Sequence, residues 1–246
     1  MSPYEIRLHS EDFRRIGLIS TVRPGCETAI TTATIPPDET TRTSWADLGL
    51  RHVSVHLQET PDATFVFLFA EYAGTDPLQA AELVQKDPWF EQLHGLLTAH
   101  PRAATHLDWF PMELINIIGP TLPHPTAPRT TQRSGFISAL EPASELQYRT
   151  LHQTNWPGVV DQMARCNRRY WVTFLIELGE KLWLFTYSEY VGEDYEADDA
   201  ATAADPVTNR WWKFTEPCLI PLRDDGKTWT QMVPLFEVTP ATPQEA

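Results

Sequence analysis

The chain repeats part of itself at a constant spacing of 118 residues. The segment Arg15–Ser20 returns as Arg133–Ser138, and Phe69–Gly74 returns as Tyr187–Gly192. Asp87-Pro88 returns as Asp205-Pro206 at the same spacing. Single matches arise by chance, but one spacing kept from Arg15 to Pro88 indicates a tandem duplication. A duplicated chain folds into two similar units, and this limits its architecture more than any other feature of the sequence.

Each half predicts the same order of elements. Helices are expected after Pro142, over Pro77–Gln85 and Trp89–Leu97, and from Trp211 onward, because proline or apolar spacing marks each of them. Apolar and β-branched runs bounded by turn residues predict the strands. The predicted strands are Ile16–Val22, Arg51–Glu59, Thr64–Tyr72 and Met112–Ile118 in the first half, and Gly135–Leu140, Tyr170–Glu177, Lys181–Tyr190 and Gln231–Val238 in the second.

The order βαββαβ is that of a ferredoxin-like unit. A four-stranded sheet with helices on one face needs a partner for its other face, and two units in one chain can cover each other. We therefore predict an α+β protein with two ferredoxin-like units packed sheet to sheet as an intrachain dimeric α+β barrel, each closing on its own last strand. The predicted units are residues 1–119 and 134–246, joined by a proline-rich linker at 120–133.

The composition argues against several classes of protein. A formal net charge of −14 repels phosphate backbones and anionic lipid, so we expect neither nucleic acid nor a membrane as a partner. Three cysteines without a Cys-x-x-Cys pair argue against a disulfide scaffold and a zinc ribbon. The N-terminus lacks the order of a signal peptide, and no apolar run reaches the length of a membrane span. We expect a soluble cytoplasmic protein, monomeric or weakly self-associating.

One group of residues in the second half indicates chemistry. Tyr148 and His152 are four residues apart, so in a helix both side chains lie on one face. Trp156-Pro157 follows, and Arg210-Trp211-Trp212-Lys213 lies further along. Tandem tryptophans supply flat apolar surface that suits the C–H face of a sugar ring. Because adjacent helical residues point about 100° apart, we expect only one of the two to line a pocket.

From Gly135 to Val238 the chain resembles the L-rhamnose mutarotase family. The family pattern Tyr-x-x-x-His-x-x-x-Trp-Pro is matched around His152, and Arg-Trp-Trp-Lys is matched at 210–213. The resemblance implies that His152 is the general acid and that the substrate-binding residues are Tyr148, Trp171, Trp211 and Trp212. Trp171 replaces a family tyrosine and so lacks its hydroxyl. The family's chains are single units that pair as α+β barrel dimers, and this chain resembles such a dimer fused head to tail.

The implied reaction interconverts the α and β anomers of a monosaccharide. It needs one proton delivered to the ring oxygen while another leaves the anomeric hydroxyl, and imidazole can do either transfer near neutral pH. No cofactor is expected, since the sequence has no glycine-rich phosphate loop. His52 and His56 share a strand face, but two ligands alone make a weak metal site, so no metal is expected.

The first half lacks this set of residues. At the spacing of 118 residues, Thr34 corresponds to His152 and Ile30 corresponds to Tyr148. Trp89-Phe90 corresponds to the tandem tryptophan, after a deletion of four residues in the first half. His52 and His56 could reach inward from the neighbouring strand, but nothing replaces His152 directly. We expect one active site per chain, with the first half as its structural partner.

Two other functions fit the same residues. The chain could be a barrel that binds a sugar or another small ligand without converting it, or a structural interaction module. A histidine on a half-exposed, half-apolar helix is often structural, and Trp211 and Trp212 could be core residues. Anomer exchange separates the enzyme from the binding barrel, and sugar binding separates the barrel from the structural module.

Overall fold

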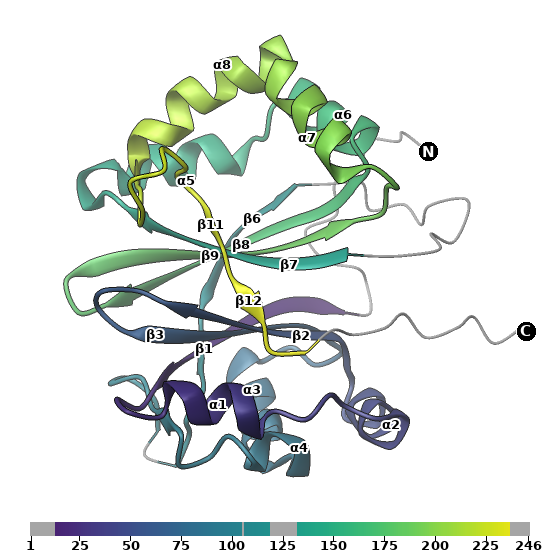
Figure 1. Cartoon of the computed structure of the whole chain (residues 1–246), viewed down its shortest axis with the longest axis vertical. Helices are drawn as coiled ribbons and strands as arrows, with labels where there is room; N and C mark the ends of the chain where they lie inside the picture. The colour runs from purple at the N-terminus through teal and green to yellow at the C-terminus, as the bar shows by residue number, and fades with distance from the viewer. Residues whose placement is uncertain (1–12, 105, 119–131, 237–246) are drawn as a thin grey trace, which may run out of the picture.

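The computed structural model describes residues 13–104, 106–118 and 132–236. They form four layers: two antiparallel sheets lie face to face, and helices cover the outer face of each sheet (Figure 1). Helices of the first half cover one sheet and helices of the second half cover the other. No helix in this part of the chain is long and apolar enough to span a membrane. The architecture is α+β, as the sequence predicts.

The first half runs from β1 to β6. Its elements are β1 (Arg14–Val22), α1 (Glu27–Ala33), α2 (Glu39–Asp47), β2 (Leu50–Glu59), β3 (Thr64–Tyr72), α3 (Pro77–Lys86), α4 (Pro88–Glu91), β4 (Leu97–Thr98), β5 (Phe110–Pro111) and β6 (Glu113–Ile118).

The second half repeats this order with longer outer helices. Its elements are β7 (Gln132–Leu140), the 3-10 helix η1 (Pro142–Ser144), α5 (Glu145–Gln153), α6 (Pro157–Arg165), β8 (Arg168–Leu178), β9 (Lys181–Tyr190), α7 (Tyr195–Ala204), α8 (Pro206–Thr215), η2 (Glu216–Cys218), β10 (Leu219–Ile220), β11 (Thr230–Gln231) and β12 (Val233–Pro234).

The last strands exchange between the two sheets. The sheet orders are β12-β2-β3-β1-β4, with β5 beside β1, and β10-β7-β9-β8-β6, with β11 beside β7. Thus β6 of the first half pairs with β8, and β12 of the second half pairs with β2. The prediction that each half closes its own sheet is wrong. A strand that crosses over hydrogen-bonds the edge of the other sheet, which would otherwise remain exposed.

Backbone details also repeat between the halves. The Met112 amide donates to the Gly17 carbonyl, and the Met232 amide donates to the Gly135 carbonyl, both at 2.8 Å. Each bond fixes the point where the chain leaves its own sheet. Gly49 and Asn167, which are 118 residues apart, both have positive φ, at 77° and 56°.

The space between the sheets is filled by aromatic and aliphatic side chains from both halves. On β3 every residue is buried, including Thr64 and Glu71 at either side of the apolar run Phe65–Ala70. The rings of Phe69 and Tyr187 stack at 3.7 Å across the interface. Gly17 allows close approach here, because a Cβ atom on it would lie 2.7 Å from the ring of Phe174. The two sheets therefore share one hydrophobic core.

Several helices differ from their prediction. Helices α2, α6 and α7 were not predicted. The apolar stripe of α2 is weak and α7 lies in the acidic run after Gly192, whereas α6 was overlooked although Val159, Val160 and Met163 form a buried face on it. The helix predicted over Trp89–Leu97 ends at Glu91, whereas α8 begins at Pro206, before the predicted start. Asp205 explains that start, since its carboxylate accepts from the Thr208 amide as an N-cap. Most of the predicted linker lies outside the described residues, and Gln132 and Arg133 begin β7.

Candidate functional site

Helix α5 positions Tyr148 and His152 on the face that packs against the second sheet. Glu145 occupies the first turn, where a carboxylate interacts favourably with the helix dipole, and His152 lies in the last turn. The two rings lie 4.1 Å apart. Tyr148 is 2 % exposed and His152 is 7 % exposed, so the expectation of a half-exposed histidine is wrong. Residues four apart meet because the helix repeats every 3.6 residues.

The hydrogen bond of His152 fixes its tautomer. Its Nδ1 atom lies 2.8 Å from the carbonyl oxygen of Tyr148. A carbonyl only accepts, so Nδ1 carries the hydrogen and Nε2 keeps its lone pair. Burial lowers the pKa of His152 to about 4, against the opposing effect of that hydrogen bond. At neutral pH the ring is therefore an uncharged base.

Helix α8 supplies an aromatic wall. The ring of Trp211 packs edge-on against His152 at 5.3 Å and against Trp156 at 5.3 Å. Trp156 is the N-cap residue of α6, and the guanidinium of Arg210 lies 4.7 Å above its ring. Trp211 is buried, whereas the neighbouring Trp212 is partly exposed. Of the two, Trp211 packs against the histidine, and that only one of them lines a pocket stays a prediction.

Small hydroxyl side chains lie on the sheet face below these helices. Thr173 on β8 and Thr186 on β9 are opposite one another in register and share a hydrogen bond of 2.9 Å. Both side chains are fully buried. Ser138 on β7 and Ser188 on β9 lie on the same face and are also buried, and Ser138 donates to the Thr228 carbonyl at 2.7 Å. These hydroxyls separate two apolar clusters of the second half, one around Tyr148 and Leu184, the other around Val160 and Met163.

Trp171 lies on the same sheet face but in a different aromatic group. Its ring packs against Phe136 at 5.2 Å and edge-on against Trp229 at 5.7 Å, and none of these three residues is fully buried. Trp229 also contacts the cluster around Tyr148, so it bridges the two apolar clusters. The structure thus brings Tyr148, His152 and Trp211 into direct contact and leaves Trp171 in the neighbouring group.

In the corresponding layer of the first half, apolar side chains stand at the positions that hold hydroxyls in the second half. Leu68 and Val55 occupy the positions of Thr186 and Thr173, and Ile30, the counterpart of Tyr148, is fully buried. Thr34 donates to the Ile30 carbonyl at 2.6 Å, the bond that His152 makes to Tyr148 in the second half. The first half thus keeps the backbone arrangement without an imidazole.

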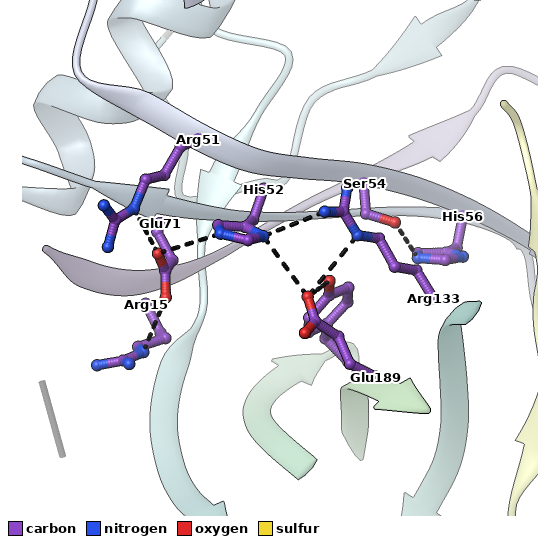
Figure 2. A network of polar contacts seen from close by, with 9 residues as sticks. Arg15, Arg51, His52, Ser54, His56, Glu71, Arg133 and Glu189 are labelled. Carbon is purple, nitrogen blue, oxygen red and sulfur yellow. Dashed lines mark hydrogen bonds and ion pairs between the residues drawn. The ribbon is translucent and has the colours of Figure 1, made fainter. Parts of the chain in front are cut away.

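The two histidines of β2 lie elsewhere. Figure 2 shows His52 and His56 projecting from β2 into the space between the two sheets. His52 has a φ of 54°, and its Nδ1 and Nε2 atoms lie 3.5 and 3.9 Å from the carboxylates of Glu189 and Glu71. Arg15 and Arg133 lie beside the same two carboxylates, at 3.5 and 3.7 Å.

This ion network joins the sheets at one end of their strands and does not replace the missing histidine. Three or more His, Cys, Asp or Glu side chains grouped to hold a metal do not occur among the described residues.

A cavity of about 530 Å³ opens between the sheets at the opposite end of these strands. Phe65 and Trp183 form its floor, and the ion pair of Asp62 and Lys181 lies at its side. None of the predicted site residues lines it. The cavity is therefore separate from the histidine on α5.

Sequence reasoning missed Trp229 and the buried hydroxyls on the sheet face below α5. We call these hydroxyls, which belong to Ser138, Thr173, Thr186 and Ser188, the hydroxyl floor. A signal was present: Thr173, Thr186 and Ser188 alternate with apolar residues on strands whose first-half counterparts are Val55, Leu68 and Ala70. A comparison of the two halves position by position would have found these changes from apolar to polar. No such comparison marks Trp229, because a tryptophan also stands at the corresponding position, Trp109.

Fold and geometry together define an α+β protein with two antiparallel sheets and a histidine-centred, helix-covered group in its second half. The family model of L-rhamnose mutarotase matches residues 133–238. The resemblance seen in the sequence is thereby confirmed over the second half of the chain.

Two curated relatives match the same half. An L-rhamnose mutarotase of Oceanobacillus iheyensis is 26 % identical over 107 residues, which are 44 % of this chain and 98 % of the relative. An L-rhamnose mutarotase of Burkholderia ambifaria is 28 % identical over 102 residues, 41 % of this chain and 92 % of the relative.

One similar solved structure extends over both halves. It is a candidate monooxygenase of Fusobacterium nucleatum, with a TM-score of 0.50 and 12 % identity over 92 % of this chain and 94 % of its own. At this identity the likeness concerns the fold alone.

Proposed function

We propose that the chain interconverts the α and β anomers of a monosaccharide such as L-rhamnose, with His152 as the proton-transfer group. The observation that carries this proposal is the difference between the two helical layers. The first is a closed apolar core, whereas the second holds a neutral imidazole and buried hydroxyls among aromatic rings. Thr173, Thr186 and Ser138 are hydrogen-bonded within the chain, whereas the Nε2 atom of His152 keeps a lone pair that a hydroxyl of a polyhydroxyl ligand can use.

The mechanism follows from the tautomer of His152. Its Nε2 lone pair takes the proton of the anomeric hydroxyl as the bond between C1 and the ring oxygen breaks and the aldehyde forms. The imidazolium then delivers that proton to the ring oxygen, which one nitrogen can reach because both oxygens are bonded to C1. After rotation about the C1–C2 bond, the reverse transfers close the ring on its other face. His152 thus acts first as base and then as acid.

The surrounding residues orient the sugar. Trp211 packs against the imidazole, and Tyr148 supplies the carbonyl that holds it. Trp171 and Trp229 present aromatic surface to the C–H face of a ring. Held in this way, the reacting groups need no diffusional encounter, which is a large part of enzymatic rate enhancement.

The arrangement of two similar units within one chain supports the proposal that the chain arose by tandem duplication.

The deciding experiment is saturation-transfer NMR of anomer exchange across a panel of hexoses and 6-deoxyhexoses. We expect the chain to accelerate exchange of at least one sugar, with L-rhamnose among those tested first. Binding without accelerated exchange would favour the non-catalytic sugar-binding barrel. A chain that neither binds nor converts any sugar of the panel would contradict both functions.

A further inference from the structure

The crossing strand β6 brings a polar side chain of the first half into the helical layer of the second. Asn116 lies opposite Thr173 in register and is 2 % exposed. Its Oδ1 atom accepts from Asn155 Nδ2 at 2.9 Å. The Nδ2 atom of Asn116 and the Oδ1 atom of Asn155 have no hydrogen-bond partner and are closed off from solvent. Unpaired buried polar atoms destabilise a fold, so such a pair calls for an explanation.

The orientation of the two amides is fixed by a third group. Asn155 Nδ2 also faces the carbonyl oxygen of Ile117 at 3.3 Å. Because a carbonyl only accepts, the nitrogen of Asn155 must point to it, and the oxygen of Asn116 must point to that same nitrogen. The spare atoms are therefore one donor, on Asn116, and one acceptor, on Asn155.

The amide pair lies at the end of α5 that carries the histidine. Asn155 follows His152 by three residues, in the short connection between α5 and α6. Tyr148, earlier on the helix, packs with Leu175 and Leu184, whereas Asn155 reaches Asn116 beside Thr173. The path from Tyr148 to Asn155 therefore runs over the hydroxyl floor, with His152 between the two.

The other crossing strand shows what the position holds where no site exists. Phe236 lies four residues after Met232, as Asn116 lies four residues after Met112. Phe236 is 5 % exposed and packs against Trp45 and Trp89 in the closed core of the first half. An apolar residue fits this position, so the asparagine is not required by the fold.

We infer that Asn116 and Asn155 are substrate-positioning residues, which bind two neighbouring hydroxyls of the sugar and make the first half one wall of the site in the second. This inference rests on the proposed function. Asn116 Nδ2 donates to one hydroxyl, and Asn155 Oδ1 accepts from the next. Asn155 is partly exposed whereas Asn116 is buried, so the sugar approaches the pair from the side of Asn155. A vicinal diol is the chemical feature recognised.

The test replaces Asn116 with leucine in the full chain. Asn116→Leu removes the unpaired donor, and Asn155 keeps its bond to the Ile117 carbonyl. We expect the melting temperature to stay the same or to rise, while KM for the converted sugar rises about tenfold, the factor for one ordinary hydrogen bond, at nearly constant kcat. The control is Gln147→Leu, which also replaces a side-chain amide with leucine but at an exposed position of α5, and it should alter neither quantity.

Deoxy sugars separate positioning from a structural role. The wild type should bind the analogue lacking the recognised hydroxyl about tenfold more weakly than the parent sugar, and Asn116→Leu should bind both equally. A variant with lowered stability and unchanged discrimination would overturn the inference while leaving the mutarotase function standing. A wild type that binds no monosaccharide would overturn the inference together with the proposed function.

Discussion

The Nδ1 atom of His152 and the carbonyl oxygen of Tyr148 lie 2.8 Å apart within α5, and this contact decides which nitrogen can do chemistry. Thr34 and Ile30 make the same contact in the first half with a hydroxyl in place of the imidazole. The two halves therefore hold different groups in one geometry, which supplies matched variants for several experiments.

Replacing His152 with glutamine should abolish most of the anomer exchange. The glutamine amide can still donate to the Tyr148 carbonyl and fill much of the space, but it does not transfer protons at neutral pH. We expect exchange to fall about 10²–10⁴-fold, the usual contribution of a general acid or base. Thr34→Val, at the equivalent position of the first half, should leave exchange unchanged. Full activity in the His152 variant would refute its catalytic role.

The pH dependence of anomer exchange should reflect the strongly lowered pKa of His152. Burial lowers the pKa of His152 to about 4, so the base form persists well below neutrality. Exchange should be constant from pH 8 to about pH 5 and should decline as pH falls toward 4, because protonation removes the lone pair. Polarimetry or NMR over this range measures it. A midpoint near the ordinary value of ~6.5 would show that the catalytic group is not this buried ring.

Acid should destabilise the fold through His56. Burial lowers the pKa of His56 to about 3, its Nδ1 atom has no partner, and its Nε2 atom is paired with Ser54 at 2.7 Å. The unfolded chain takes up this proton near pH ~6.5 and the folded chain does not. Stability therefore falls as pH drops below that value, by roughly 1.4 kcal/mol per pH unit for each such histidine. His152 adds a similar loss until pH approaches 4.

The sequence of the second half suggests a variant that removes the contribution of His56 to the pH dependence of stability. Val172 and Phe174 stand where the first half has Ser54 and His56. The double variant Ser54→Val/His56→Phe should gain about 1 kcal/mol at pH 7, because the unpaired Nδ1 atom disappears. Its unfolding free energy, measured in urea at pH 7, 6 and 5, should depend less steeply on pH than that of the wild type. An unchanged slope would mean that His56 is not the group being titrated.

Glycine at position 17 should be required for the two sheets to pack. A Cβ atom there would lie 2.7 Å from the ring of Phe174, well inside contact distance. Gly17→Ala should therefore destabilise the chain by roughly 1–3 kcal/mol, as overpacking does in other cores. Thermal unfolding measures the effect. Replacing the opposing ring with a smaller side chain, in the double variant Gly17→Ala/Phe174→Leu, should recover part of the lost stability. If the destabilising effects of the two changes simply add, the two residues do not clash and the explanation by this contact is wrong.

The sequence predicted the fold class well, because the evidence for it is local. Apolar runs such as Thr64–Tyr72 form the strands where they were expected. The exchange of β6 and β12 was not foreseen, since a terminal strand has the same pattern whichever sheet it joins. Helices α2 and α7 were missed because their apolar faces are weak, whereas α6 was missed although Val159, Val160 and Met163 form a clear buried face.

The candidate site was predictable only where a motif carries it. Tyr148, His152 and Trp211 came from such a motif and lie in contact. Asn116 could not be placed from sequence, because its position beside Thr173 depends on the strand exchange. The burial of His152 was also missed, since it results from Trp211, which follows nearly sixty residues later and closes over the ring.

The exchange of the last strands has a consequence for how such a chain can vary. In an assembly of two identical subunits, every substitution appears twice, so a change that closes one ligand site closes both. Here the two similar halves belong to one chain and differ in sequence, yet each sheet still depends on a strand from the other half. One helical layer is thus free to become ordinary core while its strand continues to support the other. Substitutions can therefore change one helical layer alone, within a frame that remains nearly symmetric.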